Sequence, residues 1–228
     1  MFEYLKIAWR NIWRNKRRTL ITATSVFFAV FLAIIMRGFM LGEWGHIIDG
    51  VLHSYSGYIQ VHSKGYWDEK TFDYSMESND SLQKEIAALP NIKNVIPRIE
   101  SFALASSEDK TKGVFLCGID PMKENAMTNL ASRLTSGSFL EMKDTAVMVS
   151  HKLAAFLNLK TNDTLVLISQ GYQGNSAAGK YPIKGIIKLP SPEFDNKMVY
   201  LPLPIAQEYY SAQGRITSLV IDIISISD

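Results

Sequence analysis

The stretch TLITATSVFFAVFLAIIM, residues 19–36, contains no charged residue and decides how the rest of the chain is interpreted. As an α-helix of about 18 residues it would be about 27 Å long, close to the thickness of the hydrocarbon core of a bilayer. Arg37 follows it, but residues 38–42, GFMLG, are again apolar, and a long arginine side chain near a helix end can reach the lipid headgroups. We therefore predict one transmembrane helix over roughly residues 20–41.

The residues before this helix set its expected orientation. Residues 1–18 contain six basic residues and one acidic residue, whereas the whole chain has a formal charge of only +2, so the remainder is net acidic. Because basic residues are retained on the cytoplasmic side of a membrane, we expect a cytoplasmic N-terminus and an exported body. A buried core helix and a cleaved signal peptide are the alternatives. The long basic region, with no A-x-A-like site after the apolar run, favours a signal anchor.

Residues 1–18 have a helical pattern of their own. Apolar residues recur on one face and basic residues on another, which is typical of a helix lying in the headgroup layer. Nucleic-acid binding by this patch is the alternative, and its direct connection to a membrane span argues against it. The residues expected at the membrane interface are Trp9, Arg10, Trp13, Arg14, Lys16, Arg17, Arg18 and Arg37.

The body, residues 43–228, has the composition of a soluble α+β domain, in one or two subdomains. Period-two alternation and turn residues predict strands, and capping residues and prolines predict the limits of helices. The expected strands are 57–62, 95–106, 113–119, 146–149, 164–169, 181–189, 198–201 and 215–224. The expected helices are 79–89, 150–159 and 202–212. The domain organisation is thus an interfacial helix (1–18), a transmembrane helix (19–42) and an exported domain (43–228).

The sequence predicts no catalytic, cofactor or metal site. The only cysteine, Cys117, excludes an internal disulfide and a cysteine zinc cluster, and its apolar strand context argues against a nucleophile. There is no G-x-S-x-G motif. The histidines lack the H-x-x-x-H spacing of a helical metal site and read as surface or structural residues: His46, His53, His62 and His151. One cluster of acidic residues lacks the central glycine of a calcium loop, and we predict that it is a solvated loop. Its members are Asp68, Glu69, Asp73 and Glu77.

Residues 174–180, GNSAAGK, match the G-x-x-x-x-G-K pattern of a phosphate-binding loop. That loop requires Ser or Thr next and then a helix, whereas Tyr181 and Pro182 follow here and introduce a strand pattern. We therefore reject nucleotide binding and predict a flexible hairpin tip, whose small residues leave the backbone free to adapt to a partner. The candidate partner-binding residues are Gln170, Gly171, Tyr172, Gln173, Gly174, Asn175 and Lys180.

Four stretches, in order, carry a resemblance to a known family. They are LKIAWRNIWRNKRRTLIT (5–22), SGYIQVH (56–62), CGIDP (117–121) and SGSFLEMKDTAVMVSHKLAAFLNLKTNDTLVLI (136–168). Together they resemble the N-terminal half of FtsX/MacB-type ABC transporter permeases, especially the lipoprotein-releasing LolC/LolE branch. In the last stretch, Asn162 replaces the glycine that is usual in the family.

The resemblance implies one span followed by an extracytoplasmic domain with "porter" and "sabre" subdomains, and a native protein that continues into three more spans. It also implies a non-enzymatic permease subunit in a bacterial inner membrane. Such a subunit works with a separate ABC ATPase and with a second permease copy or paralogue. It transmits ATP-driven motion to the exported domain, for release or export of a lipoprotein, lipid or other amphiphile.

In the lipoprotein-releasing branch, the loop that corresponds to residues 170–180 is a hook that binds a periplasmic lipoprotein chaperone. The stretch here lacks the hook's proline and phenylalanine, so chaperone binding is a hypothesis. The alternative function is a single-span, signal-anchored ligand-binding or sensor ectodomain with a concave, partly apolar pocket. A membrane-anchored hydrolase is a third interpretation, without support from the motifs.

Overall fold

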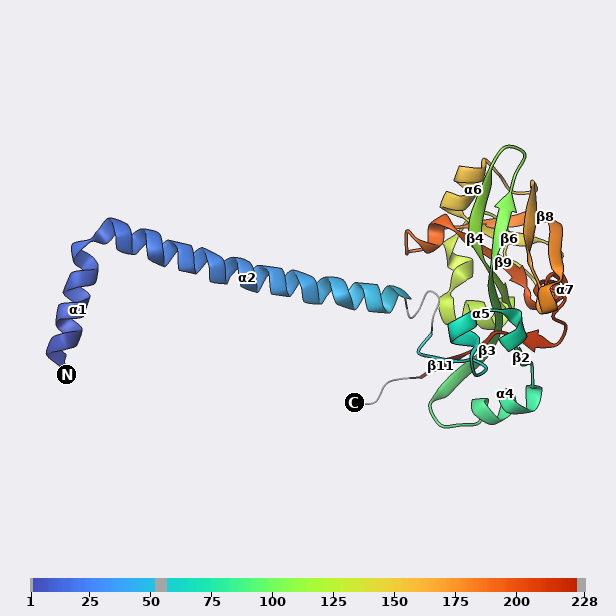
Figure 1. The fold of residues 1–228 in the computed structure, drawn as a ribbon, viewed down its shortest axis with the longest axis horizontal. Coiled ribbons are helices and arrows are strands. Elements are labelled where there is room, and N and C mark those ends of the chain that lie inside the picture. The colour runs from blue at the N-terminus through green and yellow to red at the C-terminus, as the bar shows by residue number, and fades with distance from the viewer. Residues whose placement is uncertain (1, 52–56, 225–228) are drawn as a thin grey trace. The chain divides into compact units, whose positions relative to one another are not determined.

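A computed structural model describes residues 2–51 and 57–224, and the chain divides into two compact units, residues 1–48 and 49–228. The first unit consists of helices α1 (Phe2–Arg14) and α2 (Lys16–Val51), drawn in blue in Figure 1. Asn15 separates the two helices, and the Thr19 hydroxyl donates a hydrogen bond to the Ile12 carbonyl across this break (2.8 Å). The helix break therefore lies at Asn15, and the last three basic residues of the head belong to the first turn of α2.

Helix α2 has 36 residues, which corresponds to about 54 Å. Its segment Lys16–Glu43 is long and apolar enough to cross a membrane. Two polar side chains in this segment are satisfied within the helix: the hydroxyls of Thr22 and Ser25 donate to carbonyls four residues earlier, at 3.0 and 2.8 Å. This internal pairing suits a helix in hydrocarbon, where no water is present to accept hydrogen bonds.

The second unit is a mixed α+β domain, as the sequence predicts. Its strands are β1 (Ile59–Val61), β2 (Met76–Glu77), β3 (Ile92–Ser106), β4 (Thr111–Ile119), β5 (Leu134–Gly137), β6 (Val147–Ser150), β7 (Thr164–Gln170), β8 (Ser176–Ile187), β9 (Met198–Pro202), β10 (Arg215–Ile216) and β11 (Ser218–Ile223). Its α-helices are α3 (Tyr66–Glu69), α4 (Asp80–Ala87), α5 (Pro121–Thr128), α6 (His151–Leu157) and α7 (Leu203–Tyr209).

Six strands of the main sheet close into a barrel, in the order β3-β4-β9-β6-β8-β7 and back to β3. The pairs β4–β9 and β6–β8 are parallel, and the others are antiparallel. Strand β7 closes the circuit, because it pairs with β8 along its whole length and with the far end of β3, where Ile168 lies opposite Leu104. Strand β5 adds to β8, and β11 and then β1 extend from the other part of β3.

The barrel interior is aliphatic. Alternate residues of each strand point inward, as the two-residue period of a strand requires. Helix α7 packs closely on this barrel, since a Cβ atom at Gly118 of β4 would lie only 2.3 Å from the Ala206 Cβ. The inward, buried strand residues include Ala103, Ala105, Val114, Leu116, Val147, Val149, Leu165, Leu167, Val199 and Leu201.

Several local predictions are confirmed, and others need correction. The Asn79 side chain caps α4 by accepting hydrogen bonds from the amides of Ser81 and Leu82. Ser150 precedes α6 as expected, but its hydroxyl accepts from the Met198 amide (3.2 Å) instead of capping the helix. The predicted strand 215–224 is split between β10 and β11. Helix α5 and strand β5 were not predicted.

Candidate functional site

The strand that follows α2 in the sequence lies at one end of the main sheet. Strand β1 pairs with β11, with Ile59 opposite Ile221, and β11 pairs in turn with the first half of β3. We call this end the base: β1, β11, residues 92–100 of β3, and the helices α3, α4 and α5 around them. The base thus collects the strand by which the chain enters the domain and the strand β11 beside it (Figure 1).

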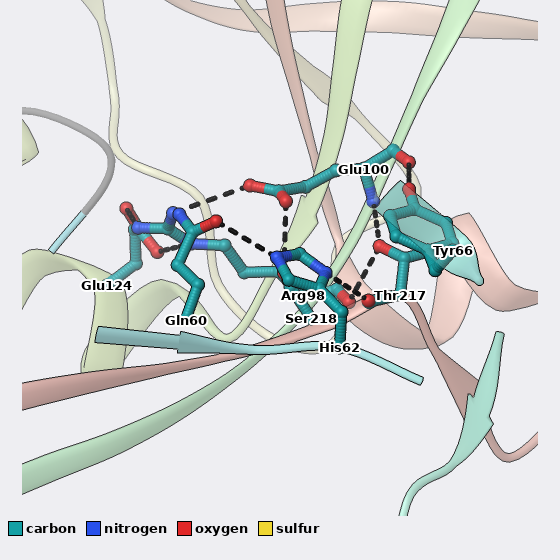
Figure 2. A network of polar contacts seen from close by, with 8 residues as sticks. All are labelled: Gln60, His62, Tyr66, Arg98, Glu100, Glu124, Thr217 and Ser218. Atoms are coloured by element: carbon teal, nitrogen blue, oxygen red, sulfur yellow. Dashed lines mark hydrogen bonds and ion pairs between the residues drawn. The ribbon is translucent and has the colours of Figure 1, made fainter. Parts of the chain in front are cut away.

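A buried ionic network holds the base together (Figure 2). The Arg98 guanidinium on β3 donates to both carboxylate oxygens of Glu124 on α5, at 2.9 and 2.7 Å, in a two-pronged geometry. Its remaining terminal nitrogen lies 3.5 Å from a carboxylate oxygen of Glu100. Arg98 and Glu124 are almost completely buried, so this network is a structural joint and not a site open to a dissolved substrate.

Hydroxyl groups connect the same network to two further elements. Ser218 of β11 donates to the second Glu100 carboxylate oxygen (3.0 Å). The Thr217 hydroxyl accepts from the Glu100 amide (2.7 Å), and the Tyr66 hydroxyl of α3 donates to the Glu100 carbonyl (2.9 Å). Glu100 is therefore the point where β3, β11 and α3 meet.

His62, immediately after β1, extends the network to the entry strand. Its Nδ1 lies 2.9 Å from the Thr217 backbone carbonyl, which can only accept, so this nitrogen carries a proton. Its Nε2 lies 3.2 Å from the Gln60 side-chain oxygen, and its ring stacks on Tyr66 with centroids 5.3 Å apart. The prediction of a surface or structural histidine is confirmed in its structural form.

Burial is the largest influence on the pKa values of Glu124, Tyr66 and Cys117. It raises the pKa of Glu124, although the Arg98 charge acts in the opposite direction, and it raises the pKa of Tyr66 to about 12. It also raises the pKa of the Cys117 thiol, which lies on β4 opposite Glu100. A thiol that resists ionisation is a poor nucleophile, in agreement with the sequence-based interpretation of Cys117.

The predicted partner-binding residues lie on the β7–β8 hairpin, but not as one loop. Strand pairing continues to Gln170 opposite Ser176, so the turn is only residues 171–175, and Lys180 lies within β8 opposite Val166. The Gly171 amide donates to the Asn175 carbonyl across the turn (2.7 Å). The turn is shorter than the sequence predicts because the small residues before Tyr181 join the strand.

This turn is also anchored to neighbouring segments. The Tyr172 amide donates to the Tyr210 carbonyl (2.8 Å), and the Gln173 amide donates to the Asp73 carboxylate (3.2 Å). A Cβ atom at Gly171 would lie 2.4 Å from the Tyr210 carbonyl oxygen, so only glycine fits there. The prediction of a flexible tip is therefore wrong for residues 171–173, and Asp73 is a partner of this turn as well as part of an acidic loop.

Residues 19–226 match the family model of the MacB-like periplasmic core domain. The chain belongs to this family. No curated protein sequence matches the chain.

Solved structures agree with this MacB-like fold. The periplasmic region of MacB from Actinobacillus actinomycetemcomitans matches with a TM-score of 0.51 and 15% identity, covering 74% of this chain and 75% of that chain. The extracellular domain of the noncanonic ABC-type transporter YknZ from Gram-positive bacteria matches with a TM-score of 0.51 and 11% identity, covering 73% and 82%. The family match, together with the apolar helix found among the described residues, indicates a membrane-anchored protein with an extracytoplasmic domain.

The residues predicted at the membrane interface all lie on the two helices before the MacB-like body. Helix α1 carries Trp9, Arg10, Trp13 and Arg14, with the two indole rings 6.1 Å apart. The first turn of α2 carries three basic residues and no acidic residue. Cations at a helix N-terminus oppose the helix dipole, so the local helix does not explain their position.

An exposed apolar patch on the barrel wall was missed by the sequence analysis. Phe102 and Leu104 of β3 are 60% and 50% exposed. Phe115 lies opposite Phe102 with ring centroids 5.2 Å apart, and Ile168 lies opposite Leu104. We call these four residues the wall patch. The sequence of β3 contains the signal for this patch, because the two-residue period of a strand places Phe102 and Leu104 on the same outward face as Glu100.

The cavities formed by the described residues give little support to the ligand-binding interpretation. A cavity of about 750 Å³ opens at the far end of the barrel, but its lining is largely charged and polar, including Glu108, Asp109, Lys110 and Asp163. This differs from the partly apolar pocket that a ligand-binding ectodomain predicts. Among the side chains that the structure describes, no group of three His, Cys, Asp or Glu residues is arranged to hold a metal ion.

Proposed function

We propose that this chain is part of the permease subunit of an ABC transporter in a bacterial inner membrane, with its N-terminus in the cytoplasm. It would work with a separate ATPase subunit and a second permease copy or paralogue. Membership of the MacB-like periplasmic core domain family supports this proposal, as does the apolar helix that precedes the domain. Residues 1–18 would lie at the cytoplasmic headgroups, residues 19–42 would span the membrane, and residues 43–228 would be exported.

In this proposal the exported domain transmits motion. The observation that carries it is the joint at the base: β1 follows α2 by a few residues, and His62 and Glu100 connect β1 to β11, α3 and β3. Strand β3 has 15 residues, about 50 Å of extended chain, and continues from the base into the barrel. A displacement of β1 would therefore move β3, and with it the barrel, as one body.

The cargo would be a lipoprotein, a lipid or another amphiphile. The wall patch supports this class, because exposed apolar residues grouped on one face of a protein often mark interaction sites. The four stretches that resemble the lipoprotein-releasing branch support it as well. A periplasmic chaperone would bind the exposed residues of the β7–β8 turn, Gln173, Gly174 and Asn175, and not the buried Gly171 or the half-buried Tyr172.

Transmission can be tested by loosening the connection to β1. A Gly-Ser-Gly-Ser insertion between Gly57 and Tyr58, in the full-length permease with its ATPase, should leave ATP hydrolysis intact and abolish cargo release from membrane vesicles. The matched control is the same insertion between Glu108 and Asp109, in the exposed β3–β4 turn, which should leave both activities unchanged. Normal release by the first variant would contradict transmission through the base.

Chaperone binding needs a separate test. Alanine replacement of Gln173 and Asn175 removes exposed side chains but keeps Gly171 and Tyr172, which anchor the turn. Capture of the periplasmic chaperone by the purified permease should fall. Unchanged capture would eliminate the turn as the binding site and leave the transmission proposal standing.

A further inference from the structure

A small basic cavity opens at the base. Its volume is about 380 Å³, and it lies between α4, the beginning of β3 and α5. Three of its lining residues are lysines, whereas only one is a carboxylate. The full lining is Asp80, Gln83, Lys84, Ala87, Lys93, Asn94, Val95 and Lys123.

The lysines of this cavity keep donors available to a ligand. Lys93 lies 3.5 Å from the Asp222 carboxylate, yet 54% of its side chain remains exposed. Lys123 donates to the Val95 carbonyl (3.3 Å), and Lys84 is exposed on α4. An ammonium group has three N–H donors, so each of the paired lysines can also donate to an anion in the cavity.

Exposed apolar residues surround the same end of the domain. Leu89, after α4, is 56% exposed, and Ile224, after β11, is 68% exposed. The Ile224 amide donates to the Asn91 carbonyl (2.9 Å), which places Ile224 beside the turn that contains Leu89. Ile59 is exposed on the edge strand β1. Lysines combined with exposed aliphatic side chains are typical of surfaces that meet lipid headgroups.

We propose that the base is a membrane-contact surface, in which the lysine cavity binds the phosphate groups of anionic lipids. Leu89, Ile224 and Ile59 then enter the headgroup layer. The occupant follows from charge complementarity and from connectivity, since β1 begins eight residues after α2 ends and its first residue lies at this end of the sheet. The proposal rests on the proposed function in one respect: α2 must anchor the chain. Contact with the leaflet would fix the orientation of the domain before each movement of the span.

The test uses the full chain in lipid nanodiscs. Leu89→Cys carries an environment-sensitive fluorophore, and the native Cys117 does not compete for the label because it is fully buried. Headgroup nitroxide lipids report contact by quenching. We expect strong quenching in discs that contain phosphatidylglycerol and weak quenching in phosphatidylcholine discs. The triple variant Lys84→Glu/Lys93→Glu/Lys123→Glu should reduce quenching about threefold or more. Added salt should also reduce quenching of the position-89 fluorophore in the protein with the three lysines intact.

Matched controls lie at the other end of the barrel. Lys110→Glu/Lys112→Glu/Lys180→Glu makes the same change of charge there and should leave the Leu89 signal unchanged. A fluorophore at Phe156→Cys, on the exposed face of α6, should not be quenched. Three results would overturn the membrane contact. They are equal quenching of the probes at positions 89 and 156, an equal loss of quenching in the two triple variants, and quenching that is the same in anionic and neutral lipid.

Failure of the anchoring can be recognised separately. A chain that does not remain in the discs contradicts the assignment of α2 as a membrane anchor, and with it this proposal. A chain that remains in the discs without quenching at position 89 overturns only the contact of the base with lipid. Lys93 pairs with the Asp222 carboxylate and Lys123 donates to the Val95 carbonyl, so the triple variant should unfold at a lower temperature than the parent. Quenching is therefore measured well below its unfolding midpoint, where its circular dichroism spectrum should match that of the parent, which excludes loss of fold as the cause.

Discussion

The barrel and the base of the exported domain are stabilised by different chemistry. The barrel encloses aliphatic side chains, whereas the base is joined by the charges of Arg98, Glu124 and Glu100 and by three hydroxyl groups. An aliphatic core accepts many exchanges of similar volume, but a buried charge requires its particular partner. The barrel should therefore determine how stable the domain is, and the base should determine where β1 and β11 sit.

The largest expected effect is that of Arg98→Met. The substitution leaves Glu124 and Glu100 buried without their cation, which should lower the free energy of unfolding by about 3–5 kcal/mol, measured by urea denaturation. Adding Glu124→Gln removes one of the unpaired charges and should recover part of the loss. A double variant as unstable as the single one would contradict charge pairing as the reason.

The corresponding change in the barrel is Leu116→Ala. Leu116 is fully buried among aliphatic side chains, and its truncation should cost about 3 kcal/mol. Hydrogen exchange distinguishes the two regions: this variant should speed exchange throughout the domain, whereas Arg98→Met should first expose the amides of β1 and β11. The same exchange pattern in both variants would show that the regions are not independent.

A smaller effect is expected for Thr217→Val. The isosteric change removes the hydroxyl that accepts from the Glu100 amide, and an unpaired buried amide costs about 1–3 kcal/mol. Exchange of the Glu100 amide should accelerate. Thr111→Val, at the exposed end of the β3–β4 hairpin, is the control and should change the unfolding midpoint little.

The smallest effect is a pH dependence. Burial raises the pKa of Glu124 in the folded domain, against the influence of Arg98. A raised pKa means that the folded state holds the proton more tightly, so this contribution to stability is present at low pH and is lost as the pH rises through the raised value. On acidification toward the ordinary value of 4.5, the wild type should gain stability relative to Glu124→Gln in paired urea titrations. A gain on raising the pH would contradict the assigned direction.

Local signals explain what the sequence could predict. The polar residues of the turn between β3 and β4 mark a hairpin, and Asn79 marks the start of α4. Asp120 and Pro121 form an equally ordinary helix start for α5, where the Asp120 side chain accepts from two amides, and this signal was available but missed.

Long-range pairing explains the rest. Nothing within 164–170 indicates that β7 joins both β8 and the far end of β3, so closure of the barrel has no local signal. Alternation along β3 places Arg98 and Glu100 on one face, but their burial depends on Glu124, which reaches them from a helix. The partner-binding role of the β7–β8 residues stays a prediction. Gln170, Gln173, Gly174, Asn175 and Lys180 among them are exposed, whereas Gly171 is buried.

The pairing of β1 with β11 also makes the exported domain modular. Ile59, the first residue of β1, lies opposite Ile221, two residues before the end of β11, so the first and last described strands of the domain run side by side, about one strand spacing apart, near 4.8 Å. A domain with adjacent ends can be inserted between two segments of a host chain without moving them apart. The same geometry allows its boundaries to be joined by a short linker and new termini to be opened in the exposed β3–β4 turn, giving a circular permutant with the same barrel.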